Sequence, residues 1–245
     1  IVIADADLLG RIAEVGAPPG VQIVVAGGEG ACRLEPMLEA GTRCDAAPPA
    51  PADLFAIMYT SGTTGPAKGV MVTHRMLRLA GEGALLVAAA QDGDVLFVWE
   101  PLYHIGGAQL VVLPLLRRVV LAMVGRFSAQ RFWSEVKAEG ATHIHFLGGI
   151  LQILLKQPAG DLDRRHGARI AWGGGCPAGI WREFETRFGM RIRECYGMTE
   201  ASSVTTFNDR GVVGAVGWPV PWFAVAVLDE QGRSVPDGTR GEIVV

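Results

Sequence analysis

Residues 59–70 read YTSGTTGPAKGV, and the apolar residues 54–59 that lead into this stretch predict a strand. Its glycines allow backbone N–H groups to turn toward an anion, and its hydroxyl side chains add further donors. Lys68 supplies a positive charge suited to a phosphate group. The stretch therefore predicts a polyphosphate-binding loop. A flexible Ser/Gly linker is the alternative, disfavoured because linkers rarely place a lysine among so many hydroxyls between two β-type segments.

The loop differs from a Walker A loop, because Ala67 rather than glycine precedes Lys68. This spacing disfavours a P-loop NTPase.

Strand-like runs alternate with helical patterns on both sides of this loop. Strands are expected at residues 21–26, 54–59, 95–99, 119–124, 142–147, 169–172 and 191–196. Helices are expected at residues 75–90 with Thr73 as the N-cap, at 128–139 before Gly140, and at 178–188 before Gly189. The alternation predicts an α/β fold with an open, largely parallel sheet flanked by helices.

The sequence pattern changes near residue 214, where the start of a β-rich subdomain is expected. Gly232 is typical of a hairpin turn. The predicted organisation is residues 1–47 as the end of a preceding α/β subdomain, 48–213 as a nucleotide- and acyl-binding α/β subdomain, and 214–245 as the β-rich start.

Composition excludes several classes of protein. The chain has 245 residues, 49% of them hydrophobic and 19% charged, with a net charge of −3, so we expect a globular protein that does not bind nucleic acid. Four cysteines without CxxC pairing argue against a zinc site or a disulfide framework and favour the cytoplasm. No membrane span is expected, because the longest apolar run, residues 105–116, is too short.

Two further segments follow predicted strands, where an open parallel sheet binds its ligands. In residues 196–200, YGMTE, Tyr196 offers a ring for stacking on a base, Thr199 a hydroxyl, and Glu200 an oxygen ligand for Mg²⁺. Residues 172–177, WGGGCP, allow close approach of a flat ligand. Taken singly, the first could be a tight turn with a solvated glutamate, and the second a helix-entry turn.

The histidines are less specific. His104 precedes a glycine pair and an apolar helical run, and a lone histidine is more often a packed structural residue. His143 and His145 share one face of a strand, and without an evident third ligand we interpret them as packing or pocket residues rather than a metal pair.

Together, YTSGTTGPAKGV, GGGCP and YGMTE resemble, in order and rough spacing, the phosphate loop, adenine-flanking turn and nucleotide-and-metal motif of the adenylate-forming superfamily. That superfamily contains acyl-CoA synthetases, firefly-type luciferases and peptide-synthetase adenylation domains. PLYHIGGAQ and IRECYGMTEAS look closest to short- or medium-chain ligases of the crotonobetaine/carnitine-CoA type.

The resemblance implies a role for each matched residue. Thr60, Ser61, Gly62, Thr63, Thr64, Gly65 and Lys68 would surround the β- and γ-phosphates of ATP; Gly174, Gly175 and Cys176 would flank adenine, with Tyr196 stacked on it and Gly197 beside it; Thr199 would meet the α-phosphate; His104, Gly148 and Gly149 would border the acyl group. It implies catalytic roles for Lys68, Thr199 and Glu200, with Glu200 holding Mg²⁺. One departure is Cys176, where the family often has alanine.

The implied function is ATP-dependent activation of a small carboxylic acid to an acyl-adenylate, followed by thioester formation with CoA. An adenylation domain that loads a carrier protein and a non-catalytic nucleotide-binding fragment stay open as alternatives. The family's ribose-binding Asp and its lysine-bearing C-terminal domain are expected beyond Val245, so we expect this chain alone to be nearly inactive. The acid and the oligomeric state are left open.

Overall fold

The computed structural model describes residues 2–17, 19–27, 32–41, 47–60 and 66–245, which fall into two units, Ile1–Pro48 and Pro49–Val245. The first unit consists of β1 (Val2–Asp5), η1 (Ala6–Leu8), α1 (Leu9–Val15), β2 (Ile23–Ala26) and α2 (Leu34–Glu39). Strands β1 and β2 pair in parallel, so this unit contains a small β–α–β arrangement.

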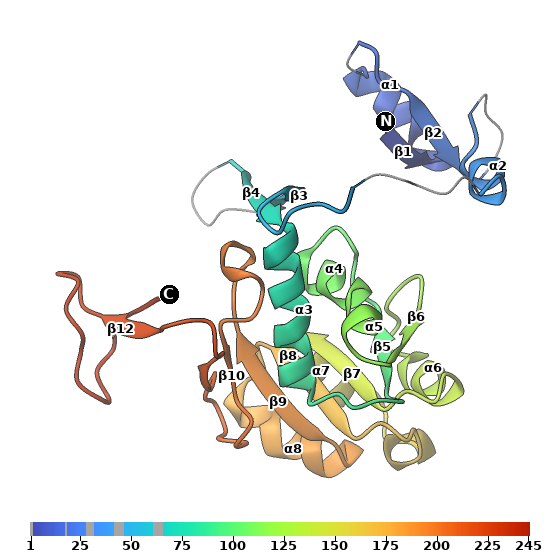
Figure 1. Cartoon of the computed structure of the whole chain (residues 1–245). Coiled ribbons are helices and arrows are strands. Elements are labelled where there is room, and N and C mark those ends of the chain that lie inside the picture. The colour runs from blue at the N-terminus through green and yellow to red at the C-terminus, as the bar shows by residue number, and fades with distance from the viewer. Residues whose placement is uncertain (1, 18, 28–31, 42–46, 61–65) are drawn as a thin grey trace. The chain divides into compact units, whose positions relative to one another are not determined.

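The second unit is built on a seven-stranded sheet (Figure 1). Its strand order is β11-β10-β9-β8-β7-β5-β6, and the bounds are β5 (Val95–Val98), β6 (Val120–Met123), β7 (His143–Leu147), β8 (Ile170–Gly174), β9 (Arg191–Tyr196), β10 (Thr206–Phe207) and β11 (Trp218–Pro219). Strands β5 to β9 run parallel to one another, whereas β10 is antiparallel to both of its neighbours, β9 and β11. The predicted α/β fold with an open, largely parallel sheet is confirmed.

Two short antiparallel pairs accompany this sheet. Strands β3 (Leu54–Thr60) and β4 (Lys68–Thr73) form a hairpin, and β12 (Ala226–Leu228) pairs with β13 (Glu242–Val244). Gly232 lies between β12 and β13 with a φ of +76°. The structure does not test the predicted subdomain boundary near residue 214, which stays a prediction.

Helices cover both faces of the sheet. Successive side chains along a strand point to opposite faces, so the apolar residues of a strand need a layer of helices on each side. The helices are α3 (His74–Ala88), α4 (Ile105–Val111), α5 (Leu113–Leu116), α6 (Phe132–Ala138), α7 (Ile150–Leu155) and α8 (Ala178–Phe188), with a short η2 (Asp161–Arg164). In β5, Leu96 and Val98 pack with residues of α3, α4 and α5, whereas Phe97 packs with α6, α7 and α8. The unit is therefore a three-layer α/β/α sandwich.

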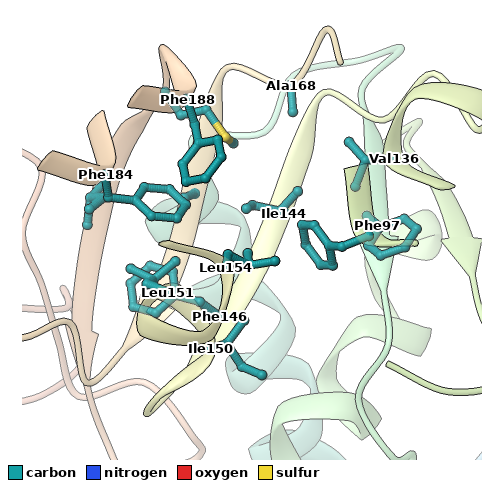
Figure 2. Packing of buried hydrophobic residues seen from close by; sticks show 14 of the residues in the cluster. Phe97, Val136, Ile144, Phe146, Ile150, Leu151, Leu154, Ala168, Phe184 and Phe188 are labelled. Carbon is teal, nitrogen blue, oxygen red and sulfur yellow. The ribbon is translucent and has the colours of Figure 1, made fainter. Parts of the chain in front are cut away.

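The face covered by α6, α7 and α8 carries the largest hydrophobic cluster (Figure 2). Phe184 and Phe188 of α8 and Leu151 and Leu154 of α7 gather there, over Ile144 of β7. These side chains are almost fully buried, so the sheet is held rigidly on this side.

Several element boundaries match the sequence patterns. Helix α8 and strand β9 have the predicted bounds, and Thr73 caps α3 by accepting a hydrogen bond from the Met76 backbone N–H at 3.2 Å. The start predicted for the helix at residue 128 is wrong, because residues 129–131 form a turn and α6 begins at Phe132. Strand β4 and helix α7 were not predicted as elements.

Among the described residues, no helix combines the length and apolar character that crossing a membrane requires.

Candidate functional site

A pocket of about 450 Å³ lies at the carboxyl ends of β7, β8 and β9, beside the start of α4 and the short η3 (Thr199–Ala201). This is the edge at which open parallel sheets bind ligands. Seven of the residues with a predicted role in the site line it: His104, Gly148, Gly174, Gly175, Tyr196, Gly197 and Thr199. Four segments far apart in the sequence therefore meet at one place.

The glycine-rich wall of the pocket begins where β8 ends. A Cβ atom on Gly173 would lie 1.8 Å from the backbone oxygen of Phe146, and the φ of Gly173 is +149°, so only glycine fits this position. Gly175, with a φ of +93°, continues the turn and leaves a wall without side chains. A flat ring can approach such a wall closely.

Glu194 of β9 holds this wall in place, a role that was not predicted from the sequence. The buried Oε1 atom accepts hydrogen bonds from the backbone N–H groups of Gly175 at 2.6 Å and Cys176 at 3.2 Å. Burial raises the pKa of Glu194 to about 7, although both hydrogen bonds act in the opposite direction. A signal exists in the sequence: Glu194 occupies the same strand face as the buried Ile192, where a carboxylate needs a partner.

Cys176 is a poor nucleophile. Its side chain is buried, and burial together with the charge of Glu194 raises the pKa of the thiol to about 12. Because a thiolate is the reactive form of cysteine, Cys176 contributes to the site through its backbone.

The adjoining wall is formed by the turn after β9, the strand next to β8. Tyr196 is the last residue of β9, and its backbone oxygen accepts a hydrogen bond from Thr205 N–H at 2.8 Å. A Cβ atom on Gly197 would lie 1.6 Å from the backbone oxygen of Ser203, so this turn closes only around glycine. Thr199 is buried against the pocket, whereas Glu200 is exposed and does not line it.

His104 has a structural role and a place in the pocket at once. Its Nδ1 accepts a hydrogen bond from Gly106 N–H at 3.0 Å and so caps helix α4. When the ring is neutral, this bond places its proton on Nε2, which is then a donor.

The two histidines of β7 differ in their surroundings. His145 lines the pocket, and its Nδ1 is hydrogen-bonded to the buried carboxylate of Glu100. His143 is fully buried and bonds to the backbone oxygen of Ala88, and burial lowers its pKa to about 4. His143 therefore packs beneath α3, and His145 belongs to the pocket.

The predicted phosphate loop connects β3 and β4. Thr60 and Lys68 are paired at the end of this hairpin that adjoins the loop, Lys68 is exposed, and β4 contacts η3. The remaining loop residues, Ser61, Gly62, Thr63, Thr64 and Gly65, lie outside the described residues. Gly149 forms the N-cap of α7 next to the pocket residue Gly148.

The donor set at Glu200 suits a metal ion that arrives with a nucleotide. Within the described ranges, no three His, Cys, Asp or Glu side chains are grouped as in a resident metal site. Mg²⁺ in nucleotide enzymes is commonly held by one or two carboxylates plus the substrate's phosphates. The single exposed carboxylate of Glu200 fits that mode.

A larger groove, of about 700 Å³, is lined by residues that include Arg78, Arg193 and Trp222. None of the residues singled out from the sequence lies in it. We therefore assign the candidate site to the smaller pocket, on the chemistry of its lining rather than on size.

Comparison with known proteins places the chain in a family. The model of the family described as AMP-binding enzyme matches residues 3–245. The chain belongs to this family. A medium/long-chain-fatty-acid–CoA ligase of Mycobacterium tuberculosis is 35% identical over 98% of this chain and 43% of the relative. A sulfoacetate–CoA ligase of Cupriavidus necator is 35% identical over 81% of this chain and 40% of the relative.

Solved structures agree with this assignment. A benzoate CoA ligase from Burkholderia xenovorans superimposes with a TM-score of 0.85 at 25% identity, covering 99% of this chain and 50% of that chain. The ATP-bound MatB of Rhodopseudomonas palustris gives a TM-score of 0.84 at 28% identity, with 99% and 49% covered. The chain thus spans about half the length of these relatives.

Proposed function

We propose that the protein containing this chain activates a carboxylic acid with ATP and transfers the acyl group to the thiol of CoA. One observation carries the proposal: the glycine-rich wall, the turn after β9 and His104 all line one pocket in a chain of the AMP-binding enzyme family. The relatives named as CoA ligases support CoA as the acceptor over a carrier protein.

The chemistry has two balanced steps. A carboxylate oxygen of the acid attacks the α-phosphorus of ATP, the bond from that phosphorus to the bridging oxygen breaks, and pyrophosphate leaves. The CoA thiolate then attacks the acyl carbon, and AMP leaves. The first step needs alignment of its reactants and offsetting of the charge that grows on pyrophosphate.

The residues of the site divide these tasks. Gly174 and Gly175 offer the flat wall for adenine, and Cys176, which does not itself line the pocket, continues their turn. Tyr196 and Gly197 lie at the end of the adjacent strand β9, with Thr199 near the α-phosphate. Lys68 and the hydroxyls of its loop bind the outer phosphates, and Glu200 holds the Mg²⁺ that offsets their charge. His104, Gly148 and Gly149 border the acid.

The identity of the acid substrate and the location of the protein in the cell rest on fewer observations. The relatives named above act, by their names, on fatty acids, sulfoacetate and benzoate, and a carnitine-type acid stays a prediction from the sequence. A cytoplasmic location likewise stays a prediction.

The test is acid-dependent exchange of pyrophosphate with ATP, measured on the full-length protein. Lys68→Ala is expected to lower the exchange rate by about 10- to 150-fold, since a charge-assisted phosphate contact contributes roughly 1.5–3 kcal/mol. Glu200→Gln is expected to raise the Mg²⁺ concentration that gives half-maximal exchange. Lys137→Ala, at an exposed lysine of α6, is the matched control and should exchange at the wild-type rate. Exchange that no acid stimulates, or a Lys68→Ala variant that keeps the wild-type rate, would contradict the proposal.

A further inference from the structure

The pocket contains a buried acid–base pair that the proposed reaction does not use. Glu100 follows β5 and has only 5% of its surface exposed, and His145 of β7 is equally buried. His145 Nδ1 and Glu100 Oε1 are hydrogen-bonded, and Glu100 Oε2 accepts from the backbone N–H of Trp99 at 3.2 Å. The carboxylate is thus partnered on both oxygens, and it fixes the orientation of the imidazole ring.

The other nitrogen of His145 has no partner among the described residues. The Trp172 ring packs on the imidazole with centroids 4.4 Å apart, and the Trp99 indole N–H donates to the His145 backbone oxygen at 2.9 Å. The ring is therefore fixed by three neighbours. Since His145 lines the pocket, its Nε2 is the atom left to meet a ligand.

Two residues of the pocket lining also carry unpaired polar atoms, but these atoms are fully buried beneath the surface of the pocket. Gln109 of α4 donates from Nε2 to the Gly106 backbone oxygen, but its Oε1 is buried without a partner, and so is the indole Nε1 of Trp172. Both residues line the same pocket as His145. His145 Nε2 is therefore the unpartnered atom left for a ligand in the pocket, and a plain hydrocarbon chain would leave it without a hydrogen bond, which is unfavourable in a buried site.

These groups lie on the elements that carry the acyl-site residues. Gln109 is in α4, which His104 caps, and His145 is in β7, which ends next to Gly148. His145 and Gln109 thus lie on the elements that carry the acyl-site residues, and these elements adjoin the wall assigned to adenine, because Gly148 N–H donates to the Gly174 backbone oxygen at 3.0 Å.

We propose that His145, oriented by Glu100, determines the specificity of the acyl pocket and selects carboxylic acids that carry a hydroxyl group on their chain. A hydroxyl can donate to a neutral Nε2 or accept from a protonated one, so it suits both states of the ring. Sites built to bind a polar group discriminate strongly against the analogue that lacks it. This inference rests on the proposed function, because it assumes that an acyl-adenylate occupies the pocket.

The test is binding of non-hydrolysable acyl-adenylate analogues, the acyl sulfamates of adenosine, to the chain by calorimetry. The analogues carry straight acyl chains of four to eight carbons, each as the plain chain and with a hydroxyl at each position along it. At least one hydroxylated analogue is expected to bind ten times or more tighter than its plain parent. In His145→Leu this preference should vanish or reverse, whereas His145→Gln, which keeps a hydrogen-bonding side chain, should retain part of it.

The control is His143→Leu in the same strand. His143 is also buried but does not line the pocket, so its replacement should lower stability and leave the hydroxyl preference unchanged. The inference is overturned if every plain analogue binds at least as tightly as its hydroxylated partners, or if His145→Leu keeps the preference. It is also overturned if His145→Leu lowers the affinity for ATP as much as the affinity for the acyl analogues, because His145 would then contact the nucleotide. Failure of all the analogues to bind better than adenosine itself would instead contradict the proposed function.

Discussion

Glu194 is a carboxylate on the inward face of β9, and its two hydrogen bonds shape the wall of the pocket. An acid whose pKa is higher in the folded state than in the unfolded chain holds its proton longer when folded. Stability from this source is therefore present below the ordinary pKa of 4.5 and is lost as the pH rises toward about 7.

Glu194→Gln removes this titration and keeps an oxygen that accepts from the backbone. We expect the free energy of unfolding of the wild type, relative to that of the variant, to be higher at pH 5 than at pH 7.5, since one pKa unit corresponds to about 1.4 kcal/mol. Urea denaturation of both proteins at the two pH values measures this difference.

The wild type must be compared with the Glu194→Gln variant because other groups change the stability with pH in the opposite direction. Burial lowers the pKa of His143 to about 4, so its contribution is present above pH 6.5 and is lost as the pH falls toward 4. Subtracting the variant cancels that contribution. If the free energies of unfolding of wild type and variant differ by the same amount at pH 5 and pH 7.5, then the pKa of Glu194 is not raised by folding.

At the scale of elements, the turn that connects β9, η3 and β10 depends on close backbone contact at Gly197. Gly197→Ala is expected to lower the free energy of unfolding by about 1–3 kcal/mol, because a Cβ atom there would overlap the Ser203 backbone oxygen. Thermal or urea denaturation measures the loss, and nucleotide affinity should fall with it, because Tyr196 and Thr199 flank the turn.

Gly179→Ala provides a matched control in helix α8. A Cβ atom on Gly179 would meet nothing within 4 Å, so the substitution should raise stability by about 0.5–1 kcal/mol through helix propensity. If both substitutions change stability in the same direction and by the same amount, the close contact at Gly197 is not what shapes the turn.

Local sequence patterns predicted some helices and strands and did not predict others. Helix α8 ends where predicted, because Gly189 adopts the left-handed conformation with a φ of +67° that a helix C-terminus favours. Helix α7 has only six residues and follows two glycines, so its apolar run had no periodicity to distinguish it. Strand β4 was missed because it opens inside the glycine-rich motif, at Lys68.

In the site, too, some features are predictable from the local sequence and others are not. Glycines and hydroxyls that bind a nucleotide through the local backbone leave a contiguous pattern, as in YTSGTTGPAKGV and YGMTE. Glu194 and Gly175 are 19 residues apart, and Glu100 and His145 are 45 residues apart. Pairings across such separations are created by strand order, which a single sequence does not reveal.

In the molecule as a whole, ligand binding is assigned to the carboxyl ends of β7, β8 and β9. The larger groove around Arg78, Arg193 and Trp222 offers an internal comparison, because it lies in the same unit and carries none of the predicted site residues. A nucleotide that bound this unit without using the predicted motifs would have that groove available.

The most direct test is backbone hydrogen exchange of the 245-residue chain with and without saturating ATP, read by mass spectrometry. Slower exchange is expected in peptides covering residues 59–70, 172–177 and 195–204, because the bound nucleotide would contact these segments. Peptides from the larger groove, residues 85–91, should exchange at the same rate in both samples. Protection confined to that groove, or no protection in the three predicted segments at saturating ATP, would contradict the assignment of this pocket as the nucleotide site.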